Sequence, residues 1–309
     1  MAIVLGQSQY GKAETRVVRI YRDTERHEIR DLNVTTALRG DFDAAHLAGD
    51  QAKVLPTDSQ KNTVFAYAKE RGIAEIEDYA LALARHFVTD IDSVSRAHVA
   101  VEEYRWERVP VEGVGHAHTF VRVGPEVRRC EVTIEAAQSV SPNYWVISGI
   151  KDLIVLKSTG SEFAGFLKDR YTTLPETTDR ILATALTARW RYASPRASTS
   201  GADVAWDHAF AQVRRILLER FALVHSRALQ QTLYEMGKAV LEARQDVVEI
   251  RLSAPNKHHF LVDLEPFGLE NPGEVFFAAD RPYGQIQCAV QRDDAPDAGP
   301  AWDSPASFA

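Results

Sequence analysis

The chain has 309 residues, of which 45% are hydrophobic and 26% charged, a balance typical of globular proteins rather than disordered or fibrous ones. The formal net charge is −7, which argues against a nucleic-acid-binding protein and requires a local cationic patch for any anionic ligand. No apolar run approaches the roughly 20 residues that span a bilayer, so we expect no membrane partner.

The first half of the chain predicts two pairs of strands with two helices between them. Strands are expected over residues 16–22 and 27–36, and again over 93–109 and 116–123. Helices are expected over 57–71 and 74–89, where an apolar stripe recurs at helical spacing. Its members are Ile76, Tyr79, Leu83 and Phe87. The predicted order is β-β-α-α-β-β.

The second half repeats much of this order. Apolar and polar residues alternate from Cys130 to Glu135, which predicts a half-buried strand, with residues 145–156 as its partner. A loop-rich stretch is expected over 157–202, then helices around 210–221 and 229–240. Further strands are expected over 248–253, 259–264 and 285–291. We therefore predict an α+β fold with two tandem antiparallel ββααββ units, 1–125 and 126–292. Residues 293–309 are expected to form a flexible C-terminal tail.

Two short segments place polar residues at the start of regular elements. Thr57 and Asp58 open a predicted helix, where free backbone N–H groups form an anion site; the ordinary role of a Thr at such a place is helix capping, which is compatible with ligand binding. Asn256 and His258 lie two apart on a predicted strand, so their side chains share one face. Near the N-terminus, Lys12 is either a solvated surface charge or a proton-transfer group beside a hydroxyl.

Three further residues have both structural and functional interpretations. Phe163 is either a core residue or a ring on which a flat aromatic ligand stacks. Arg180 is either paired with Asp179 or Glu176, or a fork-shaped clamp on a planar anion. Gln230 is either a surface amide or a donor and acceptor pair that matches the amide edge of a heterocycle.

The sequence predicts neither a metal site nor a cofactor. His116 and His118 share a strand face, but no Cys or nearby carboxylate completes a ligand set. The glycine patterns of dinucleotide and nucleoside triphosphate sites are missing, as is Gly-x-Ser-x-Gly. Cys130 and Cys288 indicate reduced thiols, and the N-terminus lacks a signal-peptide pattern. The chain ends in Ser-Phe-Ala and not in the peroxisomal tripeptide, so we expect a cytoplasmic protein.

Taken together and in order, these segments resemble the urate oxidase (uricase) family over nearly the whole chain, to about residue 291. The matching stretches are Tyr10-Gly11-Lys12, 38–42, 57–63, 155–163, 170–180, 230–236 and 255–260. The resemblance implies the tunnelling fold and a homotetramer whose sheets close into a β-barrel tunnel. It also implies the oxidation of urate with dioxygen and water to 5-hydroxyisourate and hydrogen peroxide, without metal, flavin or haem.

The resemblance assigns a role to each matching residue. Lys12, Thr57 and His258 would relay a proton. Phe163 would stack on urate, and Arg180 and Gln230 would bind its polar edges. Main-chain N–H groups of Thr57, Asp58 and Leu229 would bind the remaining oxygens and nitrogens of urate. Asn256 would hold dioxygen and then water. Leu229 stands where some relatives have Val.

The family also implies that each site is shared between subunits. One chain would supply the segments at Lys12 and at Thr57 and Asp58, and its neighbour would supply the others. Two alternatives stay open. The fold family includes pterin enzymes of the GTP cyclohydrolase type, some of which use zinc and would need a Cys/His ligand set. A non-catalytic purine-binding protein would keep the pocket without needing the proton relay.

Overall fold

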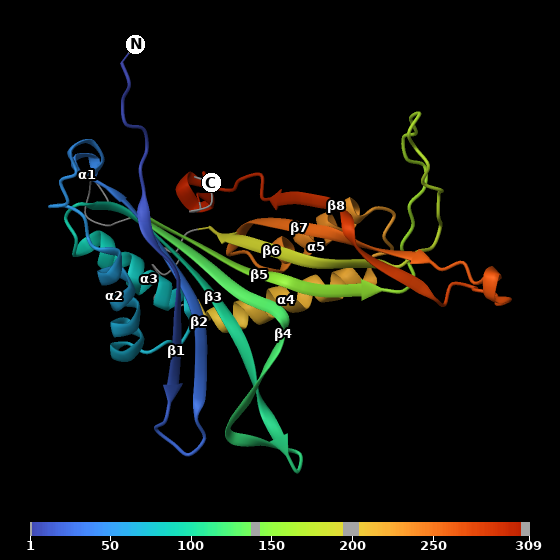
Figure 1. The fold of residues 1–309 in the computed structure, drawn as a ribbon, viewed down its shortest axis with the longest axis horizontal. Coiled ribbons are helices and arrows are strands. Elements are labelled where there is room, and N and C mark those ends of the chain that lie inside the picture. Colours follow the sequence, from blue (N-terminus) through green and yellow to red (C-terminus); the bar gives the residue numbers. More distant parts are fainter. Residues whose placement is uncertain (1, 137–142, 194–203, 304–309) are drawn as a thin grey trace. The chain divides into compact units, whose positions relative to one another are not determined.

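The computed structural model describes residues 2–136, 143–193 and 204–303, which fall into two compact units (Figure 1). Unit 1 contains residues 1–149, 191–209 and 296–309, and unit 2 contains 150–190 and 210–295. Each unit combines antiparallel strands with helices, which confirms the predicted α+β class. Among the described residues, no helix is long and apolar enough to cross a membrane.

Unit 1 is built on four antiparallel strands that neighbour one another in chain order. They are β1 (Tyr10–Tyr21), β2 (Glu28–Gly40), β3 (Val94–Val111) and β4 (Val114–Glu135). Three helices connect β2 to β3, and the last two lie along one face of the sheet (Figure 1). They are α1 (Asp43–Ala48), α2 (Thr57–Glu70) and α3 (Ile76–Thr89).

The predicted apolar stripe of α3 forms much of the core of unit 1. Its four members are all buried, as are Leu32, Val34 and Leu38 on one face of β2. Alternate residues of a strand point to opposite faces, so these three side chains face the helices together with Thr36. Burying such a side chain contributes about 1.5–3 kcal/mol, so this face fixes how α2 and α3 lie on the sheet.

Unit 2 holds most of the remaining elements, and the division between the units falls within β5, β6 and α4. The strands, in neighbouring order, are β5 (Asn143–Lys157), β6 (Leu182–Tyr192), β7 (Val247–Leu261) and β8 (Phe276–Gln291). The helices are α4 (Trp206–Leu223) and α5 (Leu229–Ala243), with a 3₁₀ turn, η2 (Glu265–Phe267). Helix α5 buries Leu229, Leu233, Met236 and Val240, the stripe predicted from the sequence.

Two features of the strands differ from the prediction. Residues 182–192 form β6, although the whole stretch 157–202 was expected to be loop-rich. Strand β4 runs without interruption from 114 to 135 and pairs with β3 on both sides of Gly124. The sequence-based boundary at 125/126 therefore lies inside one strand, beside a shift in register between Tyr104 and Trp106. The division into two equivalent ββααββ halves stays a prediction.

Part of the predicted flexible tail is packed against unit 1. A 3₁₀ turn, η3 (Gly299–Trp302), buries Pro300 and Ala301. Just beyond it, a carboxylate oxygen of Asp303 lies 3.0 Å from the guanidinium of Arg96. A composition rich in Pro, Ala and Asp predicted mobility, but apolar burial and an ion pair hold residues 296–303 in place. Residues 304–309 lie outside the described residues.

Candidate active site

The first part of the candidate site is the N-terminus of α2 in unit 1. The N-cap position is Pro56, so Thr57 and Asp58 are the first two helical residues, and no side chain among the described residues caps this end. Helix capping by Thr57 is therefore wrong. The N–H groups of the first turn have no intrahelical acceptor and lie at the positive end of the helix dipole. This end of α2 is ready to bind an anion.

Lys12 lies on β1 close to this helix terminus. Its charge is one of the groups that lower the pKa of Asp58, after the hydrogen bond and charge of Lys61 and the hydrogen bond of Asn62. The preceding Tyr10 donates its hydroxyl to the carbonyl of Leu55 at 3.1 Å, which ties β1 to the loop before α2.

Gly11 brings β1 close enough to β2 for this arrangement. A Cβ at this position would lie 1.8 Å from the carbonyl oxygen of Thr36, so only glycine fits without moving the strands. Tyr10-Gly11-Lys12 thus anchors a lysine beside an open helix terminus. The sequence predicted these residues, and the structure brings Lys12, Thr57 and Asp58 together within unit 1.

The second part of the site is a cavity of about 560 Å³ in unit 2. This volume falls within the range of small-molecule sites. Four of the predicted residues line it and come from three separate segments: Phe163, Arg180, Asn256 and His258. Leu229 and Gln230 begin α5, and neither is among the described residues that line the cavity. The N-cap Ala228 provides no side-chain cap within the described part of the chain, so the N–H groups at this end are also open.

Arg180 lines this cavity and forms no ion pair with the residues that the structure describes. Neither predicted partner binds it: Glu176 pairs with Lys168 at 2.8 Å, and Asp179 accepts the hydroxyl of Thr159 at 2.9 Å. Its Nε is buried and has no hydrogen-bond partner among the residues that the structure describes. Burial lowers the pKa of Arg180, as expected for a charge removed from water. An anionic ligand would satisfy this guanidinium.

Phe163 and Arg180 are held in fixed relation to each other. The guanidinium carbon of Arg180 lies 5.1 Å from the centre of the Phe163 ring. The backbone of Phe163 pairs with Thr177 in both directions, at 2.8 and 3.0 Å, and Arg180 donates its N–H to the carbonyl of Ser161 at 2.8 Å. An aromatic face next to a planar cation suits a flat anion.

Asn256 and His258 share the cavity as predicted, but the adjacent His259 lines it too. Simple alternation would turn His259 away. The pairing of β7 with β8 is irregular between Asn256 and His258, where the additional residues lie on β8. Burial, followed by the nearby charges of Arg180 and His259, lowers the pKa of His258. The lowered pKa favours the neutral form of the imidazole.

Arg180→Gln is expected to raise the pKa of His258. Removing a positive charge favours the protonated imidazole, so the pKa moves up, but it stays below the usual range because burial, the larger cause, remains. A titration of the His258 ring resonances by NMR measures this shift, with Arg227→Gln as the control because that side chain is 80% exposed. An unchanged or lower pKa in Arg180→Gln would contradict the electrostatic coupling.

Sequence reasoning missed the cavity residues that carry no polar chemistry. Among them are residues from two loops and the start of β8: Leu174, Pro175, Pro272, Gly273 and Phe276. The proline and glycine residues did indicate turns, but nothing in the sequence pattern placed those turns beside Arg180.

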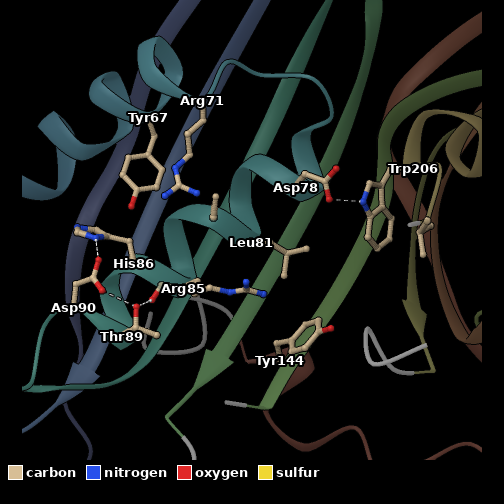
Figure 2. Close-up of a pocket in the computed structure, with 12 residues that line it drawn as sticks. Tyr67, Arg71, Asp78, Leu81, Arg85, His86, Thr89, Asp90, Tyr144 and Trp206 are labelled. Atoms are coloured by element: carbon tan, nitrogen blue, oxygen red, sulfur yellow. Dashed lines mark hydrogen bonds and ion pairs between the residues drawn. The ribbon is translucent and has the colours of Figure 1, made fainter. Parts of the chain in front are cut away.

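A second cavity, of about 480 Å³, lies in unit 1 and is lined by α2, α3 and residues near Trp206 (Figure 2). Many of its polar groups already bind one another. Trp206 donates to Asp78 at 2.8 Å, and His86 lies 2.7 Å from a carboxylate oxygen of Asp90. Its described lining includes none of the predicted site residues. The cavity in unit 2 is therefore the better candidate.

The histidines of the β3–β4 hairpin gain a neighbour that the sequence did not predict. The ring centres of His116 and His118 lie 4.5 Å apart, and His27 lies 5.8 Å from His118. Over the described ranges, no group of three or more His, Cys, Asp or Glu side chains is arranged to hold a metal ion.

Comparisons with known proteins agree with the resemblance read from the sequence. The family model described as Uricase matches residues 8–133 and 146–287. The uricase of Arthrobacter globiformis is 51% identical over 306 residues, which cover 99% of this chain and 96% of that protein. The uricase of Danio rerio is 38% identical over 290 residues, or 92% of this chain and 93% of that protein.

Solved structures give the same result. The crystal structure of uricase from Arthrobacter globiformis matches with a TM-score of 0.90, covering 98% of this chain and all of that one. The urate oxidase of Bacillus sp. TB-90, only 23% identical, matches with a TM-score of 0.81 over 92% of this chain and supports the fold alone. The predicted tunnelling fold is confirmed. The family model and the full-length relatives together show that this chain belongs to the uricase family.

Proposed function

We propose that this chain oxidises urate with dioxygen and water to 5-hydroxyisourate and hydrogen peroxide, using the residues described above. The observation that carries the proposal is the guanidinium of Arg180 beside the Phe163 ring, with its buried Nε unpartnered among the described residues, in a cavity that His258 also lines. Urate is flat, anionic and edged with amide groups, and it matches each of these features. Family membership favours it over a pterin.

Binding would use the flat ring of the purine and its polar edges. Phe163 stacks on the ring, and Arg180 forms charge-assisted hydrogen bonds with the anionic edge. Gln230 offers a donor and an acceptor to an opposite amide edge. The open N–H groups of Thr57, Asp58 and Leu229, at the starts of α2 and α5, bind the remaining oxygens and nitrogens of urate.

Oxidation begins with a proton transfer. The Thr57 hydroxyl and Lys12 relay a proton from the bound urate monoanion, with neutral His258 as a further acceptor. The resulting dianion is electron-rich enough to reduce dioxygen directly. Two electrons and two protons pass to dioxygen and give hydrogen peroxide, and water then adds to the oxidised ring to give 5-hydroxyisourate. Asn256 holds dioxygen first and the attacking water afterwards.

We further propose that each site forms where two chains of a homotetramer meet. Lys12, Thr57 and Asp58 belong to unit 1, and the other site residues belong to unit 2. Closed symmetric oligomers repeat such a junction at every interface. Large apolar side chains left exposed on strands support an interface, because β7 and β8 expose Phe260 at 51% and Phe277 at 63%.

The direct test is to add urate in air and follow its ultraviolet absorbance together with the release of hydrogen peroxide. The two signals should change in equal molar amounts. A protein that binds urate without releasing peroxide would instead be a purine-binding protein. Because the proposed chemistry needs no metal, exhaustive treatment with a chelator should leave the rate unchanged. A rate lost to the chelator and restored by zinc or copper would overturn the proposed mechanism.

A further inference from the structure

We propose that Thr36 and Gln60 are positioning residues that hold Lys12 in register with the N-terminus of α2, an inference that rests on the proposed function. Gln60 lies one helical turn after Thr57, and Thr36 lies on β2 opposite Lys12. Both side chains are buried, with 0% and 2% of their surface exposed. Neither residue would contact urate.

A chain of hydrogen bonds joins the strand to the helix. The backbone N–H of Lys12 donates to the Thr36 hydroxyl at 3.3 Å. The same hydroxyl donates to the side-chain carbonyl of Gln60 at 2.7 Å, in a buried bond. β1, β2 and α2 lie next to one another in unit 1 (Figure 1), so this chain spans the three elements that carry the relay. It fixes the base of the Lys12 side chain relative to Thr57.

The ladder between β1 and β2 is interrupted directly after Lys12. The register of β1 on β2 shifts between Lys12 and Thr15, and Glu14 adopts a positive φ of 55°. Regular ladder hydrogen bonds are interrupted at such a shift, and the strand bends there. The hydroxyl of Thr36 takes up the Lys12 N–H at the edge of this irregularity. Side-chain bonds thus add to the placement of Lys12 where the backbone ladder is interrupted.

Packing alone does not explain a glutamine at position 60. Its Nε2 is buried and has no hydrogen-bond partner among the described residues. A buried donor without a partner opposes folding, and replacing both Gln60 and Thr36 with apolar side chains of similar shape can be neutral or stabilising. Features that oppose stability are expected at functional sites. The amide is therefore better explained by what its carbonyl holds than by the core it fills.

The test compares Thr36→Val with a matched control on the same strand. Thr35 also accepts a backbone N–H from β1, that of Glu14 at 3.0 Å, but it points to the opposite face and has no link to α2. Thr36→Val is expected to lower the turnover of urate by about 10- to 100-fold with little change in KM, because misplacing a reacting group affects the chemical step. Thr35→Val should leave both constants unchanged.

Two further variants separate positioning from folding. Thr36→Ser keeps the hydroxyl and should restore most of the turnover. The double variant Thr36→Val/Gln60→Met removes both partners of the buried bond, so its melting temperature should fall less than that of Thr36→Val alone while its turnover stays low.

If Thr36→Val behaves like Thr35→Val while the parent chain oxidises urate, the positioning inference fails and the proposed function survives. If KM in Thr36→Val rose by the same factor by which its turnover fell, the positioning inference would also fail. If the parent chain releases no peroxide from urate, both proposals fail.

Discussion

Replacing Lys12 with Met, or Thr57 with Ala, is expected to lower the turnover of urate about 10²- to 10⁴-fold, the usual contribution of a general acid–base group. The structure places Lys12 near Asp58 and leaves the hydroxyl of Thr57 free of any capping bond within the described residues. Both side chains are half-buried, so neither change removes a large part of the core. The double variant should lose little more than the worse single variant, because the two groups act in one relay.

Steady-state rates of peroxide release measure this effect, and two controls match the chemistry of each change. Lys53→Met removes an exposed lysine that pairs with Asp41 on the surface of unit 1. Thr63→Ala removes a hydroxyl of α2 that donates to the carbonyl of Ser59 at 2.9 Å. Both controls should keep parental turnover. If Lys12→Met lost no more activity than Lys53→Met, the proton relay would be ruled out.

Arg180→Gln is expected to raise the KM for urate about 10- to 100-fold, with a smaller loss of turnover. A hydrogen bond to a charged group is worth about 1.5–3 kcal/mol, and each 1.4 kcal/mol corresponds to a tenfold change in an equilibrium constant. The guanidinium has no ion pair with the described residues, so the substitution breaks no salt bridge that stabilises the fold. The effect should therefore appear in binding and not in the melting temperature.

The control for this change is Arg215→Gln. Arg215 lies on the surface of α4, is 62% exposed, and pairs with Glu219 at 2.9 Å. The Arg215→Gln variant should have the same KM for urate as the parent chain. Equal KM values for Arg180→Gln and the parent would show that Arg180 does not clamp the anion.

Much of the site could be predicted because its residues occupy positions with strong local signals. Thr57 and Asp58 follow Leu-Pro and begin an amphipathic run, which predicts a helix start. Asn256 and His258 lie two apart in a strand, so the period of two places them on one face. The resemblance to a known family added the roles of these residues, which neither spacing nor composition could supply.

Other features depend on contacts between segments far apart in the sequence. The bond between Thr36 and Gln60 joins β2 to α2, and no local pattern pairs a threonine with a glutamine 24 residues later. His259 is among the residues that line the cavity, beside an irregularity in the pairing of β7 with β8 that joins distant parts of the sequence. The packing of Ala301 in η3 likewise requires a surface provided by unit 1. Tertiary contacts decide each of these cases.

β6 illustrates how a strong neighbouring signal can hide a strand. Residues 157–181 are rich in turn-forming and polar residues, and the structure there consists mostly of loops and isolated bridges. The strand that follows buries Leu182, Leu186 and Trp190. Its apolar residues include many alanines, which have a low preference for strands. Burial against neighbouring elements outweighs that preference.

The claim that each active site needs two chains is tested most directly by mixing two defective variants. One carries Lys12→Met and Thr57→Ala, and the other carries Arg180→Gln. They bear different tags, so that hetero-oligomers can be isolated, and are assayed at a urate concentration where each alone is inactive. In a mixed oligomer, some junctions combine the intact unit 1 residues of one chain with the intact unit 2 residues of another.

Co-expressed variants should therefore recover part of the parental rate of peroxide release, whereas variants mixed after each has assembled should recover little. Isolated hetero-oligomers that contain both tags and still release no peroxide from urate would contradict the shared site and would mean that each active site is built within one chain.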